Sequence, residues 1–138
     1  MAKKRINQVD PNQGSKVKAQ DAPNYDDYMP IFSLERVQPG DYCFSVLDQN
    51  HKAMFSEAIF RRKSTKWSDI KKAGRHGIGT EKIPKIAIKA PIPNFITEDV
   101  NDFLVFRYHG KNPMVGYRQH NVFFVLWFDH DFTLYDHG

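Results

Sequence analysis

The stretch that decides the fold is FLVFRYHGKNPMVGYRQHNVFFVLWFDHDFTLYDH, residues 103–137. Apolar and polar side chains alternate along much of it, which is typical of β-strands. We predict four strands, at residues 103–109, 114–118, 122–128 and 132–137, because the intervening GKNP, QHN and DHD are favourable turn sequences. Such short turns join antiparallel neighbours, so the sequence predicts a four-stranded antiparallel C-terminal sheet. The third strand is apolar on both faces and is expected to be central.

Two N-terminal helices are predicted to pack on this sheet. Residues 47–64, LDQNHKAMFSEAIFRRKS, have apolar side chains at helical spacing, with Asp48 or Asn50 as the N-cap and cations in the last turn. Residues 66–73, KWSDIKKA, predict a second and shorter helix with Trp67 on its buried side. Helices followed by an antiparallel sheet indicate an α+β fold.

The remaining segments carry weaker signals. Residues 31–37, IFSLERV, are expected to form a short strand or a turn before a Pro-Gly pair. Residues 81–100 contain several prolines, which predicts an extended crossing segment that includes one edge strand. Residues 1–24 are polar and basic with little to bury, so we predict a flexible tail, followed by a single α+β domain over residues 25–138.

Composition limits the class of protein. Hydrophobic residues make up 41% of the 138 residues, which is enough for one packed domain. No run approaches the 18 apolar residues expected of a membrane-spanning helix. Cys43 is the only cysteine, so no intramolecular disulfide can form, as is typical of a reducing compartment. We therefore expect a cytoplasmic protein that has no membrane partner.

Positive charge is concentrated in one segment. The formal net charge is +4, and residues 61–75 contain seven Lys or Arg against one Asp. Such a field favours a nucleic acid or another polyanion as partner, although a solvated helix face explains the run equally well. The residues predicted to contact nucleic acid are Arg61, Arg62, Lys63, Lys66, Lys71, Lys72, Arg75 and Arg107.

The C-terminal strands carry the residues that acid–base chemistry would require. Cleavage of RNA without a metal needs a base for the 2′-hydroxyl proton, an acid for the leaving oxygen, and fixed cations for the phosphorane. His109, Tyr135 and His137 are the candidates for proton transfer, since histidine titrates near neutral pH. Arg118 is the candidate for charge stabilisation, together with Arg107. Each could equally be an ordinary surface residue.

No metal or cofactor is predicted. Asp129, His130, Asp131 and His137 lie close together in sequence, but their spacing matches no known metal motif, and neighbouring residues of a strand point to opposite faces. The glycines in RHGIGTEK, residues 75–82, also lack the spacing of a phosphate-binding loop.

Four features of the C-terminal part belong together: the element order over residues 48–137, the segment Gly116–Arg118, the strand at 122–128, and the final Tyr135 and His137. In these features the chain resembles the RelE/ParE/YoeB-like toxins of bacterial toxin–antitoxin systems. The resemblance implies a small basic protein that cleaves messenger RNA without a metal, free or on the ribosome, or one that poisons gyrase. It also implies an acidic antitoxin-like partner that covers the active sheet.

A different class of function fits the same residues. A non-catalytic module could bind nucleic acid or a protein through exposed aromatic side chains, for which Tyr117, Phe123 and Trp127 are the candidates, while the basic segment supplies attraction. The sequence leaves the toxin-like enzyme and the binding module both open.

Overall fold

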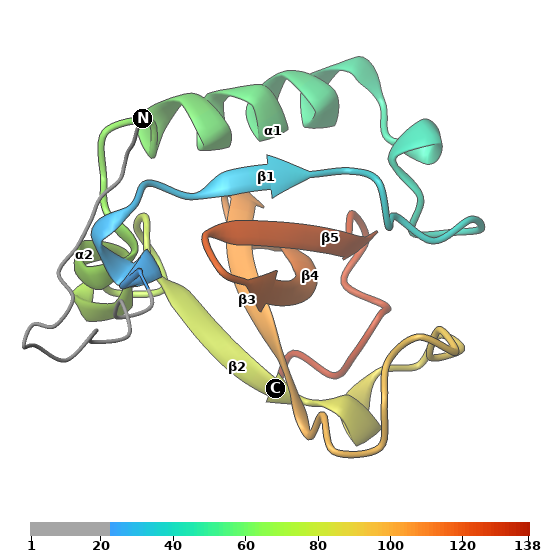
Figure 1. Ribbon diagram of the computed structural model, residues 1–138. Coiled ribbons are helices and arrows are strands. Elements are labelled where there is room, and N and C mark those ends of the chain that lie inside the picture. The colour runs from blue at the N-terminus through green and yellow to red at the C-terminus, as the bar shows by residue number, and fades with distance from the viewer. Residues whose placement is uncertain (1–22) are drawn as a thin grey trace, which may run out of the picture.

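The computed structural model describes residues 23–138, so the predicted tail at residues 1–24 lies almost entirely outside the described part. The fold is α+β and is built on a five-stranded sheet with the strand order β1-β5-β4-β3-β2 (Figure 1). The strands are β1 (Ile31–Ser33), β2 (Thr80–Pro84), β3 (Asp102–His109), β4 (Asn112–Gln119) and β5 (Val122–Phe128). The helices are α1 (Gln49–Arg61) and α2 (Trp67–Lys72), with 3-10 turns η1 (Tyr25–Asp27), η2 (Phe44–Val46) and η3 (Lys85–Ala87).

The predicted architecture of two helices on a four-stranded antiparallel sheet is wrong. The sheet has five strands and is mixed, because β1 pairs with β5 in parallel, with Ile31 opposite Val122. The other pairs, β2 with β3, β3 with β4 and β4 with β5, are antiparallel. Only α1 is a helix of several turns, since α2 contains six residues.

The helix α1 packs on one face of the sheet. Asp48 is its N-cap, with a side-chain oxygen that accepts a hydrogen bond from the His51 amide at 2.8 Å. Phe55 and Ala58 point inward, and Figure 1 shows the helix running along the top of the view beside β1. The core on this face contains Leu47, Phe55, Ala58, Trp67, Ile70, Phe106, Tyr108, Met114, Phe123, Val125 and Phe128.

Within the described residues, no α-helix covers the second face of the sheet. Loop segments and the 3-10 turn η3 cover it instead, and they explain why β5 is apolar on both sides. The last residues fold back over this face, where Leu134 and Tyr135 are both buried, and the Lys89 amide donates a hydrogen bond to the Leu134 carbonyl at 2.8 Å. The core on this face contains Ile83, Ile88, Phe103, Val105, Val115, Leu126, Trp127, Leu134 and Tyr135.

The strand predicted at residues 132–137 is not formed. The buried Asp129 carboxylate accepts hydrogen bonds from the amides of Thr133 at 2.9 Å and Leu134 at 3.1 Å, which closes a turn instead of a ladder. Phe132 has a φ of 61°, a left-handed conformation outside the extended region that regular strand residues adopt. The alternation of polar and apolar side chains here is therefore not a strand pattern, since the adjacent Leu134 and Tyr135 are both buried.

A register shift marks β4 between Val115 and Gly116. A Cβ atom added at Gly116 would lie 1.9 Å from the carbonyl oxygen of Phe124 on β5, so only glycine fits this close approach of two backbones. The described residues contain no helix that is both long and apolar enough to span a membrane.

Candidate functional site

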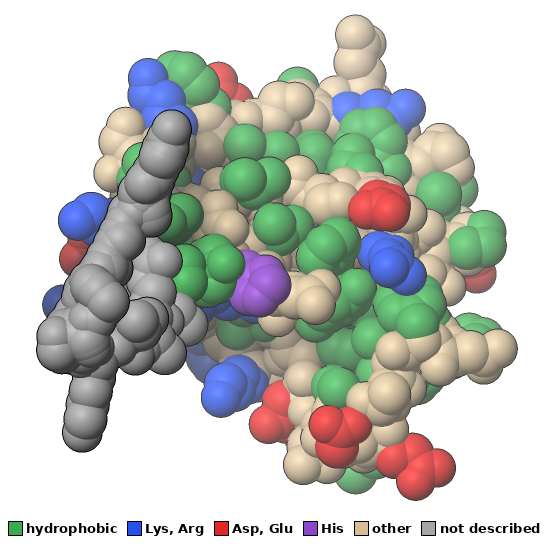
Figure 2. Space-filling view, viewed as in Figure 1, with side chains coloured by type: hydrophobic (Ala, Val, Ile, Leu, Met, Phe, Trp, Pro, Cys, Tyr) green, Lys and Arg blue, Asp and Glu red, His purple; other side chains and the backbone are tan. Residues whose placement is uncertain are grey.

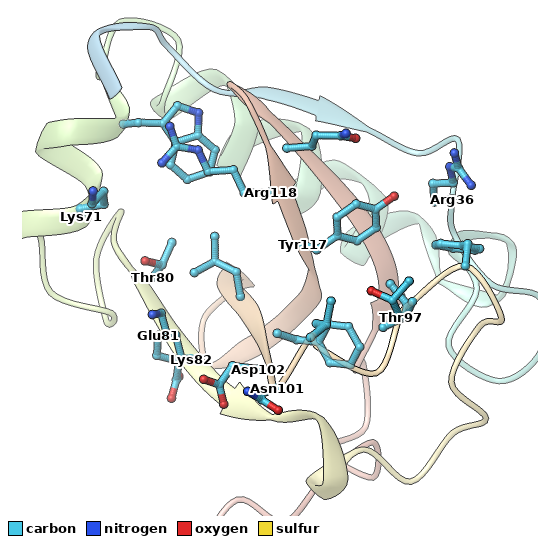
Figure 3. Close-up of a pocket in the computed structure, with 17 residues that line it drawn as sticks. Arg36, Lys71, Thr80, Glu81, Lys82, Thr97, Asn101, Asp102, Tyr117 and Arg118 are labelled. Atoms are coloured by element: carbon cyan, nitrogen blue, oxygen red, sulfur yellow. The ribbon is translucent and has the colours of Figure 1, made fainter. Parts of the chain in front are cut away.

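An open groove of about 1110 Å³ crosses the sheet at the start of β3. Its walls come from β2, the end of β4, α2 and the segment that leads into β3. Figure 3 shows Tyr117 and Arg118 on one side of this space and Lys82 on the other. The charged side chains that line the groove are the basic Arg36, Lys71, Lys82 and Arg118 and the acidic Glu81 and Asp102. The lining is therefore net positive.

One end of the groove is aromatic. The Tyr117 ring stacks on Phe124 with centroids 5.1 Å apart, and Phe95 lies 6.3 Å from Tyr117. The Arg36 guanidinium lies 4.7 Å from the centroid of Phe95, a cation–π distance. Burial raises the pKa of the Tyr117 hydroxyl, so this group is a neutral donor at physiological pH. The rings of Phe95 and Tyr117 and the Arg36 guanidinium therefore line the same end of the groove.

The other end of the groove is cationic. The Arg118 guanidinium lies 4.2 Å from the centroid of Trp67, the buried aromatic residue of α2. Arg118 also pairs with Asp26 at 2.7 Å, and Lys71 pairs with the other oxygen of the same carboxylate at 2.8 Å. The side-chain hydrogen bonds from Lys71 and Arg118 hold the pKa of Asp26 below its usual range. The carboxylate is therefore charged at neutral pH and joins two cations.

The predicted basic residues have different surroundings in the structure. Arg62 is fully buried and donates to the carbonyls of Ala58 at 2.7 Å and Ile78 at 3.0 Å, so it supports the fold. Burial lowers the pKa of Arg62 to about 10. Four predicted residues are exposed and form no salt bridge within residues 23–138, namely Arg61, Lys63, Lys66 and Lys72.

Two further predicted cations share one carboxylate. Glu81 pairs with Arg107 at 2.6 Å and with Arg75 at 3.5 Å, and the Arg107 guanidinium also contacts His76 at 3.3 Å. Glu81 partly neutralises both arginines. Of the eight predicted nucleic-acid contacts, Lys71 is the one that lines the groove.

The four predicted catalytic residues do not converge. The pairing of Leu104 with Gly116, continued by two residues, places Arg118 opposite Asp102. His109 is seven residues further along β3 than Asp102. At a rise of roughly 3.3 Å per residue, His109 and Arg118 are therefore about 23 Å apart. Tyr135 belongs to the core of the second face. His137 contacts the Tyr135 ring at 4.1 Å and pairs with the buried Asp129 at 2.8 Å. The pair ties the C-terminal segment to the turn after β5.

His109 instead belongs to a histidine cluster that sequence reasoning missed. Its ring lies 4.7 Å from that of His51 on α1, and the His130 ring lies 6.3 Å from His51. The Nδ1 atom of His51 is 2.8 Å from the Tyr108 hydroxyl, and Asn50 bonds to His109 at 3.2 Å. Burial lowers the pKa of His51. The nearby Asp48 carboxylate opposes this shift, and the imidazoles of His109 and His130 add to it. The three histidines come from three separate segments of the chain, so no local sequence pattern predicts the cluster.

Two of the three aromatic residues proposed for a binding module are not exposed. Phe123 and Trp127 are buried on opposite faces of β5, and only Tyr117 reaches a surface that a ligand can use. Figure 2 shows hydrophobic side chains mixed with Lys and Arg on the face that Figure 1 presents. Among residues 23–138, no group of three or more His, Cys, Asp or Glu side chains is placed to hold a metal ion.

Comparisons with known proteins do not add a family to this description. No protein-family model matches the chain. A search of curated proteins and a search of solved structures also give no match. The resemblance to the RelE/ParE/YoeB-like toxins therefore stays a prediction from the sequence.

Proposed function

We propose that the protein binds single-stranded nucleic acid, with RNA as the expected form, in the groove at the start of β3. The observation that carries the proposal is the combination of partly exposed aromatic rings and cations in one groove. Phe95 and Tyr117 offer faces on which bases can stack, while Arg36 and Arg118 lie where they can contact phosphates. Proteins that bind single strands combine these two elements, a basic channel and aromatic platforms.

The exposure of the aromatic lining also favours a single strand. Tyr117 is only half-buried and Phe95 is exposed, and both line the groove. Unstacked bases can reach such a surface, whereas the bases of a duplex are already stacked on each other. A cytoplasmic setting is proposed together with this function. Cys43 is the only cysteine of the sequence, which is typical of proteins in a reducing compartment, and RNA is abundant in the cytoplasm.

Replacing Tyr117 with leucine tests the groove. Leucine keeps apolar contact with Phe124 but removes the flat face, and loss of one base–aromatic stack is expected to weaken binding about 5- to 150-fold. The measurement is the fluorescence anisotropy of labelled single-stranded RNA, single-stranded DNA and duplex RNA over a series of salt concentrations. Affinity for the single strands should exceed that for the duplex and should fall steeply with salt.

Phe60→Leu is the matched control. Phe60 is an exposed aromatic residue at the end of α1, and its ring lies 4.4 Å from the Lys63 ammonium, outside the groove. The control should bind RNA as the unmodified protein does. Equal losses in the two variants would place binding along the basic segment, and no binding at low salt would overturn the proposal.

A second function, metal-independent RNA cleavage, is favoured by the histidine cluster. Cleavage needs one imidazole to accept the 2′-hydroxyl proton and another to protonate the leaving 5′-oxygen. His51 is suited to be the base, because its lowered pKa leaves it neutral at pH 7, and His109 lies next to it as the acid. An acidic antitoxin-like protein is the expected partner of such an enzyme. Tyr135 and His137 would take no part, since they belong to the opposite face.

The pH dependence of cleavage and two substitutions test this second function. With labelled RNA and EDTA, alone or with ribosomes, His51→Gln and His109→Gln should each lower the rate by roughly 10²- to 10⁴-fold. The pH–rate profile should have two limbs, because the base must be deprotonated and the acid protonated. Since the pKa of His51 lies below its usual value, the acidic limb, where His51 gains a proton, should lie below the usual histidine pKa of about 6.5. His120→Gln, outside the cluster, is the control. No cleavage under either condition would leave RNA binding as the function.

A further inference from the structure

We infer that Lys71 and Arg118 form a phosphate-binding site that the carboxylate of Asp26 occupies when no ligand is bound. The inference rests on the proposed function, and it assigns the cationic end of the groove to the binding of a phosphate group. Arg118 donates to one oxygen of Asp26 at 2.7 Å and Lys71 donates to the other at 2.8 Å. Two oxygens of a phosphate group can accept hydrogen bonds from Arg118 and Lys71 in the same arrangement. Asp26 thus occupies the place of the ligand.

The position of Arg118 does not depend on Asp26. Its guanidinium lies 4.2 Å from the centroid of Trp67, and its Nε donates to the His120 carbonyl at 2.7 Å. Trp67 is itself fixed, because it is buried and its indole nitrogen donates to the Asn121 carbonyl at 2.9 Å. The arginine is therefore held in place for an anion by contacts that survive when the carboxylate moves away.

Asp26 comes from a segment separate from the groove walls. It lies in the short turn η1, whose N-cap Asn24 accepts a hydrogen bond from the Asp26 amide at 3.1 Å. The Asp26 side chain is about one-third exposed, and the Lys71 side chain is more than half exposed. Rotation of one side chain is enough to release both cations, while the bond from the Trp67 amide to the Tyr28 carbonyl at 2.9 Å keeps the segment attached.

The charges favour exchange with a phosphate group. One carboxylate between two cations leaves a net charge of +1, so a phosphodiester or inorganic phosphate can replace Asp26 without creating an unpaired cation. Because the pKa of Asp26 is lowered, the carboxylate stays ionised throughout the neutral range and always competes. Asp26 is therefore an internal competitor that lowers the affinity of the groove for nucleic acid.

Two single substitutions at adjacent positions, each of which removes one negative charge, test the inference. Asp26→Asn should lower the Kd for labelled single-stranded RNA roughly three- to tenfold, as expected when two surface ion pairs no longer compete. Asp27→Asn is the matched control, because Asp27 is the exposed neighbour, makes no salt bridge within residues 23–138 and changes the net charge equally. Its Kd should change less than about twofold.

A second probe separates the phosphate site from RNA binding. Inorganic phosphate, followed by amide chemical shifts, should perturb the Arg118 region in Asp26→Asn at lower concentration than in Asp27→Asn. Adding Arg118→Gln and Lys71→Gln to Asp26→Asn should abolish the gain. Asp26→Ser serves as a second variant if asparagine alters the turn, as judged by circular dichroism.

The outcomes distinguish this inference from the proposed function. If RNA binding depends on Tyr117 but Asp26→Asn and Asp27→Asn have the same Kd for RNA, the inferred phosphate site is wrong, while the proposal that the groove binds RNA is supported. If no variant binds RNA but phosphate perturbs Arg118 selectively in Asp26→Asn, the anion site stands and the groove function is wrong. A gain in affinity that persists without Lys71 and Arg118 overturns the inference.

Discussion

Gly116→Ala is expected to lower the free energy of unfolding by about 3 kcal/mol or more, the upper end of the range for overpacking a well-packed site. The added methyl group would lie 1.9 Å from the Phe124 carbonyl oxygen and 2.9 Å from its carbon. Both atoms belong to the backbone of β5, so no side-chain rotation can relieve the clash. The two interior strands β4 and β5 must separate locally and lose ladder hydrogen bonds. Urea denaturation followed by circular dichroism measures the change.

Gly74→Ala is the control for this substitution. A Cβ at Gly74 meets no atom within 4 Å, and its φ is not in the left-handed region, so the cost should stay within about 0.5 kcal/mol. If the two variants unfold at the same denaturant concentration, β4 and β5 do not approach as closely at Gly116 as the structure indicates.

Arg62→Ala is expected to cost about 2–4 kcal/mol of stability, because it removes buried hydrogen bonds and leaves a cavity. The side chain is fully buried above Phe106, with its guanidinium 4.9 Å from that ring. It connects the end of α1, through the Ala58 carbonyl, to the loop before β2, through the Ile78 carbonyl. Without it, the buried Ala58 carbonyl and the partly buried Ile78 carbonyl lose their donor. Thermal and urea unfolding provide the measurement.

Arg61→Ala provides the comparison at the preceding position. Arg61 is exposed, so its loss should change stability by less than about 0.5 kcal/mol. Arg62→Met should recover part of the loss, since its side chain fills the space of the arginine stem without restoring the hydrogen bonds. Equal stability of Arg61→Ala and Arg62→Ala would contradict the buried role of Arg62.

Three strands could be located from the sequence within two residues. The predictions at 103–109, 114–118 and 122–128 correspond to β3, β4 and β5, because hairpin turns and alternation are local signals. β1 and β2, of three and five residues, lie in the two segments where the sequence indicates a short strand or turn and an edge strand, but their partners lie far away in sequence. Their pairing depends on tertiary contacts, which a local pattern does not contain.

The candidate site was only partly predictable for the same reason. Arg118 and Lys71 were identified by residue type, and both line the groove. Arg36 and Phe95 lie in segments without regular structure, where no periodicity predicts the direction of a side chain. Asp26 could not be connected to the groove from sequence, because its partner Lys71 is 45 residues away.

The parallel pairing of β1 with β5 has a consequence for the order of folding. Ile31 pairs with Val122, 91 positions later, which is the pairing of longest range in the sheet. Contacts of such high contact order form slowly, because a long loop must close before they contribute. During synthesis the antiparallel strands can assemble as they emerge, while β1 has no partner until the last strand is complete. The N-terminal edge of the sheet therefore joins the nascent protein last.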